Sequence, residues 1–235
     1  MYIYGMGARF YCLYAASELA DCFSPWNVPP PKTTKTHSTE DFDPATGLFL
    51  KARQVPSPNL DNRPEGLDID ALIIHAISLP PGQYGDGYIE QFFCNQLEKE
   101  AHPYFAEIAD IKVSSHFFIH RSGELVQFVP VHQRAWHAGA SCCMGREAVN
   151  DFSIGIELEG CDDDTFEEAQ YLTLIELTQM LVTALPTLST EHIYGHADIA
   201  PGRKTDPGPG FDWQFYRSAL SMPSFQVASK ENDAL

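Results

Sequence analysis

The sequence has few basic residues, and this shortage argues against two kinds of partner. Lysine and arginine together number 15, against 32 aspartates and glutamates, and the formal net charge of the 235-residue chain is −17. Proteins that bind nucleic acid or an anionic membrane surface carry basic patches, so this balance argues against both. The acidity is typical of a protein kept soluble in the cytoplasm.

The sequence also lacks paired cysteine motifs and long apolar runs. None of its six cysteines forms a C-x-x-C pair, and Cys142 is adjacent to Cys143, so we interpret them as free thiols in a reducing compartment. No apolar run is long enough to span a bilayer. Residues 10–17 resemble a weak signal sequence, but Glu18 interrupts it and Asp21 replaces the small residue needed for cleavage. The predicted localisation is therefore cytoplasmic.

Composition divides the chain into three parts. Residues 1–46 contain a run of prolines and a polar stretch that bury little, which predicts an N-terminal extension or linker. The sequence leaves open whether this part is a small ordered extension or precedes the true start. Residues 47–225 are expected to form a single domain, and residues 226–235 a frayed tail.

Within the domain, apolar periodicity alternates between that of strands and that of helices. Strands are expected over residues 71–78 and 153–159 and in a hairpin over 115–129; helices are expected over 88–101, from a capping box at 165–168 to Pro186, and over 213–220. This mixture predicts an α/β fold with a mixed central β-sheet covered by helices.

Residues 195–209 combine reactive side chains with glycine and proline. Such a segment cannot continue a helix or a central strand, and polar groups on a stiff loop are common at functional sites. His196 and Asp206 are suitable ligands for a divalent metal, and Lys204 adds a positive charge beside them. His75, at the end of a buried strand, could complete the three protein ligands of a hydrolytic zinc site. Spacing alone does not establish this set, because an isolated histidine there is usually structural.

Glu157 lies on the polar face of a strand whose other face is apolar. A carboxylate beside a metal can take a proton from an attacking water and pass it to a leaving nitrogen. The structural alternative is that Glu157 and Glu159 belong to a solvated sheet edge. Lys204 could stabilise an oxyanion, or it could be an exposed lysine paired with Asp198 or Asp206.

Several blocks of residues, in one unbroken order over about residues 48–220, resemble a known family. The blocks are residues 55–59, 74–82, 101–108, 113–116, 134–139, 150–160 and 195–209. They are similar to the zinc-dependent N-acetylmuramyl-L-alanine amidases, in particular to members that act on anhydro-muropeptides in bacterial cell-wall recycling. So many blocks in one order are far more specific than a single motif.

This resemblance implies an amidase or peptidoglycan-recognition-like fold and a set of functional residues. It implies one zinc ion held by His75, His196 and Asp206, with Glu157 as the catalytic acid/base and Lys204 as the electrostatic stabiliser. The implied reaction cleaves the amide bond between the lactyl group of N-acetylmuramic acid and L-alanine of a muropeptide. The alternatives are an exported lytic amidase acting on intact cell wall and a non-catalytic muropeptide-binding module, which usually lacks a zinc ligand.

Substrate contacts are expected from Trp136, Arg146 and His137. The flat indole of Trp136 suits a sugar ring, and the guanidinium of Arg146 matches a substrate carboxylate, although an exposed loop arginine is equally expected. His137 is interpreted as a groove residue or a neighbour of the metal ligands, and His116 as a buried, hydrogen-bonded histidine. Ala76 replaces the asparagine that commonly follows the first metal histidine of the family, so the preference between anhydro and intact sugars stays unassigned.

Overall fold

The structure is a computed structural model, and it describes residues 41–222. The predicted tail at 226–235 and all but the last residues of the predicted extension lie outside this range. The elements are β1 (Phe42–Asp43), β2 (Leu48–Phe49), β3 (Arg53–Gln54), β4 (Leu60–Asn62), β5 (Ala71–Ile77), α1 (Tyr88–Phe93), η2 (Lys99–Ala101), α2 (Phe105–Ile108), β6 (Phe117–Ile119), β7 (Leu125–Gln127), β8 (Gln133–Ala135), β9 (Cys142–Cys143), β10 (Arg146–Glu147), η3 (Val149–Asp151), β11 (Ser153–Glu159), α3 (Glu168–Ala184), β12 (Ile193–Gly195), α4 (His196–Ile199) and α5 (Trp213–Ser221).

A six-stranded sheet with the strand order β12-β5-β11-β6-β7-β3 forms the centre of the domain. Strands β12, β5, β11 and β6 run parallel, whereas β7 is antiparallel to β6, and β3 follows the direction of β7. The predicted mixed sheet is therefore confirmed, and so is the hairpin that β6 and β7 form. Among residues 41–222, no helix is both long and apolar enough to cross a membrane.

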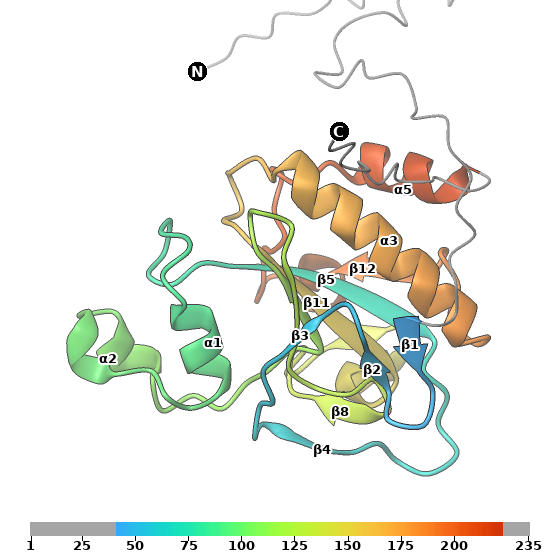
Figure 1. The fold of residues 1–235 in the computed structure, drawn as a ribbon, viewed down its shortest axis with the longest axis horizontal. Coiled ribbons are helices and arrows are strands. Elements are labelled where there is room, and N and C mark those ends of the chain that lie inside the picture. The colour runs from blue at the N-terminus through green and yellow to red at the C-terminus, as the bar shows by residue number, and fades with distance from the viewer. Residues whose placement is uncertain (1–40, 223–235) are drawn as a thin grey trace, which may run out of the picture. The chain divides into compact units, whose positions relative to one another are not determined.

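The two longest strands, β5 and β11, lie side by side in the interior of the sheet. Helices α3 and α5 lie together on one side of the sheet (Figure 1). The alternate residues Ile74, Ile154 and Ile156 belong to the same apolar cluster as the buried residues of these helices. Alternation places His75 and Glu157 on the opposite face. Strand β11 is buried along its whole length, so the solvated-edge alternative for Glu157 is wrong.

Helix α1 is shorter than its sequence pattern predicts. The apolar spacing suggested a helix over residues 88–101, but α1 ends at Phe93. Asn95 adopts a left-handed backbone conformation with φ of 57°, and its carboxamide exchanges two hydrogen bonds with that of Asn59, at 2.9 and 3.0 Å. This pairing of residues that are distant in the chain competes with the backbone hydrogen bonds that would extend the helix. The apolar pattern of residues 88–101 gives no information about it.

Helix α3 begins two residues later than the sequence predicts. Its N-cap is Glu167, whose backbone carbonyl accepts from the Gln170 N–H at 3.0 Å, while the Gln170 side chain accepts from the Glu167 N–H at 3.0 Å. Gln170 also donates to Glu159 O at 3.0 Å. The start of α3 is therefore tied to the end of β11.

The first two strands extend the described domain to a point before residue 47. Phe42 lies opposite Phe49 in an antiparallel pair, and their ring centroids are 5.0 Å apart. Phe49 is fully buried and contacts the Phe117 ring at 5.2 Å, so Phe42 packs onto the main core. The end of the predicted extension thus contributes to the domain.

Candidate active site

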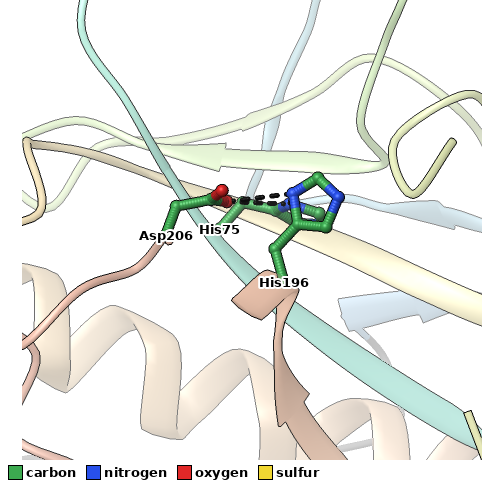
Figure 2. A group of neighbouring side chains, drawn as sticks. All are labelled: His75, His196 and Asp206. Carbon is green, nitrogen blue, oxygen red and sulfur yellow. Dashed lines mark hydrogen bonds and ion pairs between the residues drawn. The ribbon is translucent and has the colours of Figure 1, made fainter. Parts of the chain in front are cut away.

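Three potential metal ligands meet at the carboxyl end of the parallel strands. His75 lies near the end of β5, His196 begins α4 directly after β12, and Asp206 lies in the following loop (Figure 2). The two Nδ1 atoms of the histidines are 2.9 Å apart, and Asp206 Oδ2 lies 3.3 Å from His75 Nδ1 and 3.1 Å from His196 Nδ1. Both imidazoles are buried.

The topology explains why these residues meet. Strands β5 and β12 are parallel neighbours, with Gly195 opposite Ile74, so His75 and His196 leave the sheet at the same edge. The loop then turns back, and the backbone N–H of Ala197 donates to Asp206 O at 2.9 Å. Sites outside the carboxyl ends of parallel strands are the general rule in open α/β sheets.

The protonation of the cluster suits a cation. His196 Nε2 faces the Ala138 carbonyl at 3.3 Å, so that nitrogen carries the hydrogen and Nδ1 presents a lone pair to the cluster. Burial lowers the pKa of His75 to about 4, so its ring is neutral at neutral pH. Converging nitrogen and oxygen lone pairs fit a divalent metal ion.

Glu157 lies beside this cluster on the neighbouring strand. It is opposite His75 in the β11–β5 register and is only 8% exposed. Its Oε2 atom has no hydrogen-bond partner among residues 41–222. Burial, followed by the negative charge of Asp206, raises its pKa well above the ordinary value. A buried carboxyl with a raised pKa at a groove is the arrangement that acid/base catalysis requires.

A groove of about 570 Å³ connects the cluster with an apolar wall. Its polar lining includes Glu157, His196, Lys204 and Asp206. The same groove is also lined by aromatic and aliphatic side chains: Phe92, Phe93, Tyr104, Ile108, Ile111, Val113 and Trp136. The groove therefore combines polar chemistry with a surface for an apolar or ring-shaped group.

The structure brings most of the predicted site residues together. Lys204 is exposed and lines the groove, and Trp136 and Ala76 line it as well. His137 also reaches the groove, but it is 8% exposed and both ring nitrogens are engaged, by His75 at 2.9 Å and Ser153 at 3.2 Å. No ring nitrogen of His137 is left for a hydrogen bond to substrate.

Arg146 lies away from these residues. Its Nη2 atom donates to both carboxylate oxygens of Asp70, at 2.7 and 2.9 Å, and its guanidinium lies 3.8 Å from the centre of the Phe152 ring. Arg146 is not among the residues that line the groove in the described domain. The structure thus supplies the carboxylate partner that had been expected from the substrate.

The sequence did not identify Tyr104 in the groove lining, nor the residues that contact His137 beside the candidate metal ligands. Tyr104 lies in the matching block at 101–108 and could have been identified there. Asn150 and Ser153 lie in the matching block at 150–160, but the block does not indicate which residues they contact. Their contacts with His137, described below, join segments that are not adjacent in the chain.

A cluster of metal-ligating side chains beside a buried, proton-holding carboxyl at the end of a groove is the arrangement of a metal-dependent hydrolase. Residues 65–209 match the family model described as N-acetylmuramoyl-L-alanine amidase. Because the match spans more than half of the chain, the protein belongs to the N-acetylmuramoyl-L-alanine amidase family.

Known proteins of high similarity carry a more specific name. The chain is 49% identical over 174 residues to the 1,6-anhydro-N-acetylmuramyl-L-alanine amidase AmpD of Haemophilus influenzae, covering 74% of this chain and 95% of that protein. It is 50% identical over 175 residues to AmpD of Escherichia coli, with coverage of 74% and 95%. A crystal structure of a selenomethionine derivative of AmpD superimposes with a TM-score of 0.74 at 48% identity, covering 77% of this chain and 99% of that one.

Proposed function

We propose that the protein is a zinc-dependent amidase of peptidoglycan recycling. Its reaction would be hydrolysis of the amide bond between the lactyl group of anhydro-N-acetylmuramic acid and L-alanine of the stem peptide. The observation that carries this proposal is the convergence of His75, His196 and Asp206 beside Glu157. The identity of about half of the aligned residues with AmpD proteins supports the choice of substrate.

The ligand atoms fit zinc in type and spacing. Zinc binds histidine nitrogen and aspartate oxygen, and catalytic sites use three protein ligands with one open position. Ligands about 2.0–2.1 Å from a tetrahedral ion lie about 3.3 Å from one another. The separations of 2.9 to 3.3 Å between the two Nδ1 atoms and Asp206 Oδ2 are close to that value. When bound, zinc polarises a carbonyl and makes water a stronger nucleophile.

The chain's own residues supply the proton transfer. Glu157 takes a proton from the water whose oxygen attacks the lactyl carbonyl carbon, holds it, and delivers it to the alanine nitrogen as the carbon–nitrogen bond breaks. A carboxyl with a raised pKa suits this task because it must keep the proton between the two steps. Lys204, which lines the groove and whose charge acts on Glu157, stabilises negative charge on the carbonyl oxygen.

The aromatic and aliphatic lining of the groove binds the sugar. Trp136 supplies an indole to this lining, which also includes Tyr104 and the aliphatic side chains of Ile108 and Ile111. Flat apolar faces pack well against the ring of a sugar. We assign substrate contact to Trp136 and not to Arg146, whose guanidinium is already paired with Asp70.

We further propose that the reaction takes place in the cytoplasm. The four cysteines of the described domain, Cys94, Cys142, Cys143 and Cys161, are all free thiols. Free thiols are typical of proteins in a reducing compartment. This supports recycling of imported fragments in preference to the lysis of cell wall outside the cell.

The proposal is tested with the full-length protein, loaded with zinc and offered an anhydro-muropeptide or the matching intact muropeptide. We expect release of a peptide with a free N-terminal alanine, detected by mass spectrometry, faster from the anhydro substrate. Glu157→Gln with equal zinc content is the matched control and should release almost none. Faster cleavage of the intact substrate would favour the lytic alternative, and binding without cleavage of either would favour the binding module.

A further inference from the structure

Both metal-binding histidines turn their second ring nitrogen toward the same short segment, residues 137–138. We propose that this segment, held by Asn150, is a positioning device that fixes both imidazoles in the tautomer and orientation that bind the metal. The inference rests on the proposed metal site, but it concerns residues that are not among the clustered ligand atoms.

The first arm of the device is a chain of hydrogen bonds with one possible direction. The Val149 carbonyl can only accept, so Ser153 Oγ donates its single hydrogen to it at 2.6 Å. Ser153 Oγ must then accept from His137 Nε2–H at 3.2 Å, which leaves a lone pair on His137 Nδ1. That lone pair accepts from His75 Nε2–H at 2.9 Å. His75 Nδ1 therefore keeps its own lone pair, directed at the cluster.

The second arm acts on His196 in the same way. The Ala138 carbonyl accepts from His196 Nε2–H at 3.3 Å and leaves Nδ1 free for the cluster. Arg203 Nη2 donates to the same carbonyl at 2.7 Å, so its oxygen is fixed from a second side. The acceptors for the two histidines thus come from consecutive residues.

Asn150 connects the two arms. Its Oδ1 atom accepts the backbone N–H of His137 at 3.1 Å and that of Ala138 at 2.7 Å. One side-chain oxygen therefore holds the backbone that carries both acceptors. Residues that orient metal ligands from behind normally contribute strongly to metal affinity.

Strand β11 leaves room for the His137 ring at Gly155. Ser153, Gly155 and Glu157 alternate on one face of this strand, which places the end of the hydrogen-bond chain and the acid/base on the same surface. A Cβ atom on Gly155 would lie 2.5 Å from His137 Cγ, so the imidazole can lie there only above a glycine.

The main test compares two substitutions of His137. Asparagine can present a carboxamide oxygen close to the position of the missing Nδ1, whereas leucine fills the space without an acceptor. We expect His137→Leu to weaken zinc binding about 10- to 100-fold and His137→Asn to stay within a few-fold of the unsubstituted protein. Zinc affinity is measured by competition with a chelator on full-length protein, with circular dichroism as the check on folding. Equal zinc affinity in folded His137→Leu would overturn the proposal.

Two serine substitutions separate this role from a general loss of buried hydrogen bonds. Ser115 is buried like Ser153 and donates to Gly155 O at 2.7 Å, but it lies outside the chain that leads to His75. Ser153→Ala should weaken zinc binding several-fold, whereas Ser115→Ala should not. Equal losses in the two variants would contradict the proposal.

Nuclear magnetic resonance of the metal-free protein tests the tautomers directly. Nitrogen-15 spectra of the imidazoles should show His75 and His196 both protonated at Nε2. Ser153→Ala should disturb only His75, whereas Asn150→Leu should disturb both. A proton on Nδ1 of either histidine in the unsubstituted protein would refute the proposal. These measurements need no substrate, so a protein that fails to cleave muropeptides could still satisfy them, and the two proposals fail separately.

Discussion

Strand β5 has a polar cluster at each of its ends, and the two clusters differ in how their charges are satisfied. Before the first residue of β5, Asp70 accepts two hydrogen bonds from Arg146. Near its last residue, His75 faces His196 and Asp206 with atoms that present only lone pairs. At this second end, Glu157 Oε2 also has no partner within the described domain.

The comparison shows that available partners, and not residue types alone, distinguish a functional cluster from a structural one. Leaving a buried polar atom unpaired costs about 1–3 kcal/mol, so such atoms are uncommon unless a ligand satisfies them. Arg146 has the charge expected of a substrate contact, but Asp70 satisfies it. Glu157 Oε2 has no such partner among residues 41–222 and lies beside the cluster of candidate metal ligands, so the second end is the one suited to chemistry.

The largest expected effect comes from removing one of the three candidate metal ligands, His196. His196→Ala leaves two of the three protein ligands, which is fewer than a catalytic zinc site uses. We expect the zinc content of the purified protein to fall to near zero and amidase turnover to fall to background. Zinc is measured by atomic emission and turnover by release of the stem peptide. Full zinc content in this variant would show that another residue holds the metal.

Glu157→Gln is expected to separate metal binding from catalysis. The glutamine keeps the size of the side chain but cannot carry a proton between the water and the leaving nitrogen, so the turnover number should fall by about 10²- to 10⁴-fold. Zinc affinity should change little, because Glu157 is not among the clustered ligand atoms. Turnover and chelator competition are measured on the same preparation, and unchanged turnover would exclude Glu157 as the acid/base.

Lys204→Met tests the positive charge of Lys204, which lines the same groove as Glu157. Lys204 is exposed and its side chain lines the groove, so its removal should leave folding and zinc content intact. Loss of one oxyanion-stabilising group lowers turnover by about 10²-fold in comparable sites, and an exposed lysine should contribute no more than that. Lys204→Arg, which keeps the charge, should recover part of the loss. A raised KM with an unchanged turnover number would instead indicate that Lys204 binds the substrate.

The buried carboxyl of Glu157 should also reduce the stability of the metal-free protein in a pH-dependent way. The pKa of Glu157 is raised on folding, so the unfolded chain releases this proton at a lower pH than the folded protein does. This loss of folding stability is absent below the ordinary glutamate pKa of about 4.3 and grows as the pH rises above it. Metal-free Glu157→Gln should therefore be more stable than the unsubstituted protein at pH 7, by on the order of 1 kcal/mol. Thermal melts at pH 7 and pH 4 should show this advantage shrinking at the lower pH.

The sequence predicted the central elements well because their signals are local. The apolar run at 71–78 and the alternation at 153–159 correspond closely to β5 and β11. The glycine and proline content of 195–209 predicted the loop that carries Asp206, but the prediction of a loop was wrong for the start of this segment, where Gly195 ends β12 and His196–Ile199 form the short helix α4. The sequence could not predict where α1 ends, because this depends on an amide pair between Asn59 and Asn95.

The parts of the site that the sequence missed depend on contacts between distant segments. The direction of the hydrogen bond from His75 is decided by His137 and Ser153, and the partner of Arg146 is Asp70. None of these pairs has a characteristic spacing in the chain. A residue type predicts what a side chain can do, whereas its role also depends on which partners the fold brings to it.

Arg146→Ala should have the smallest effect and sharpens the contrast between the two ends of β5. The Arg146–Asp70 pair is part-exposed, with side-chain exposures of 37% and 25%, so its loss should reduce the free energy of unfolding by less than about 1 kcal/mol. Loss of the guanidinium from the Phe152 ring should add a fraction of that amount. Zinc affinity and the KM for the anhydro-muropeptide should not change, because Arg146 is paired with Asp70 and is not among the described residues that line the groove. A several-fold rise in KM, without loss of zinc, would show that Arg146 binds the substrate. Its pairing with Asp70 would then be replaced by a pairing with the substrate.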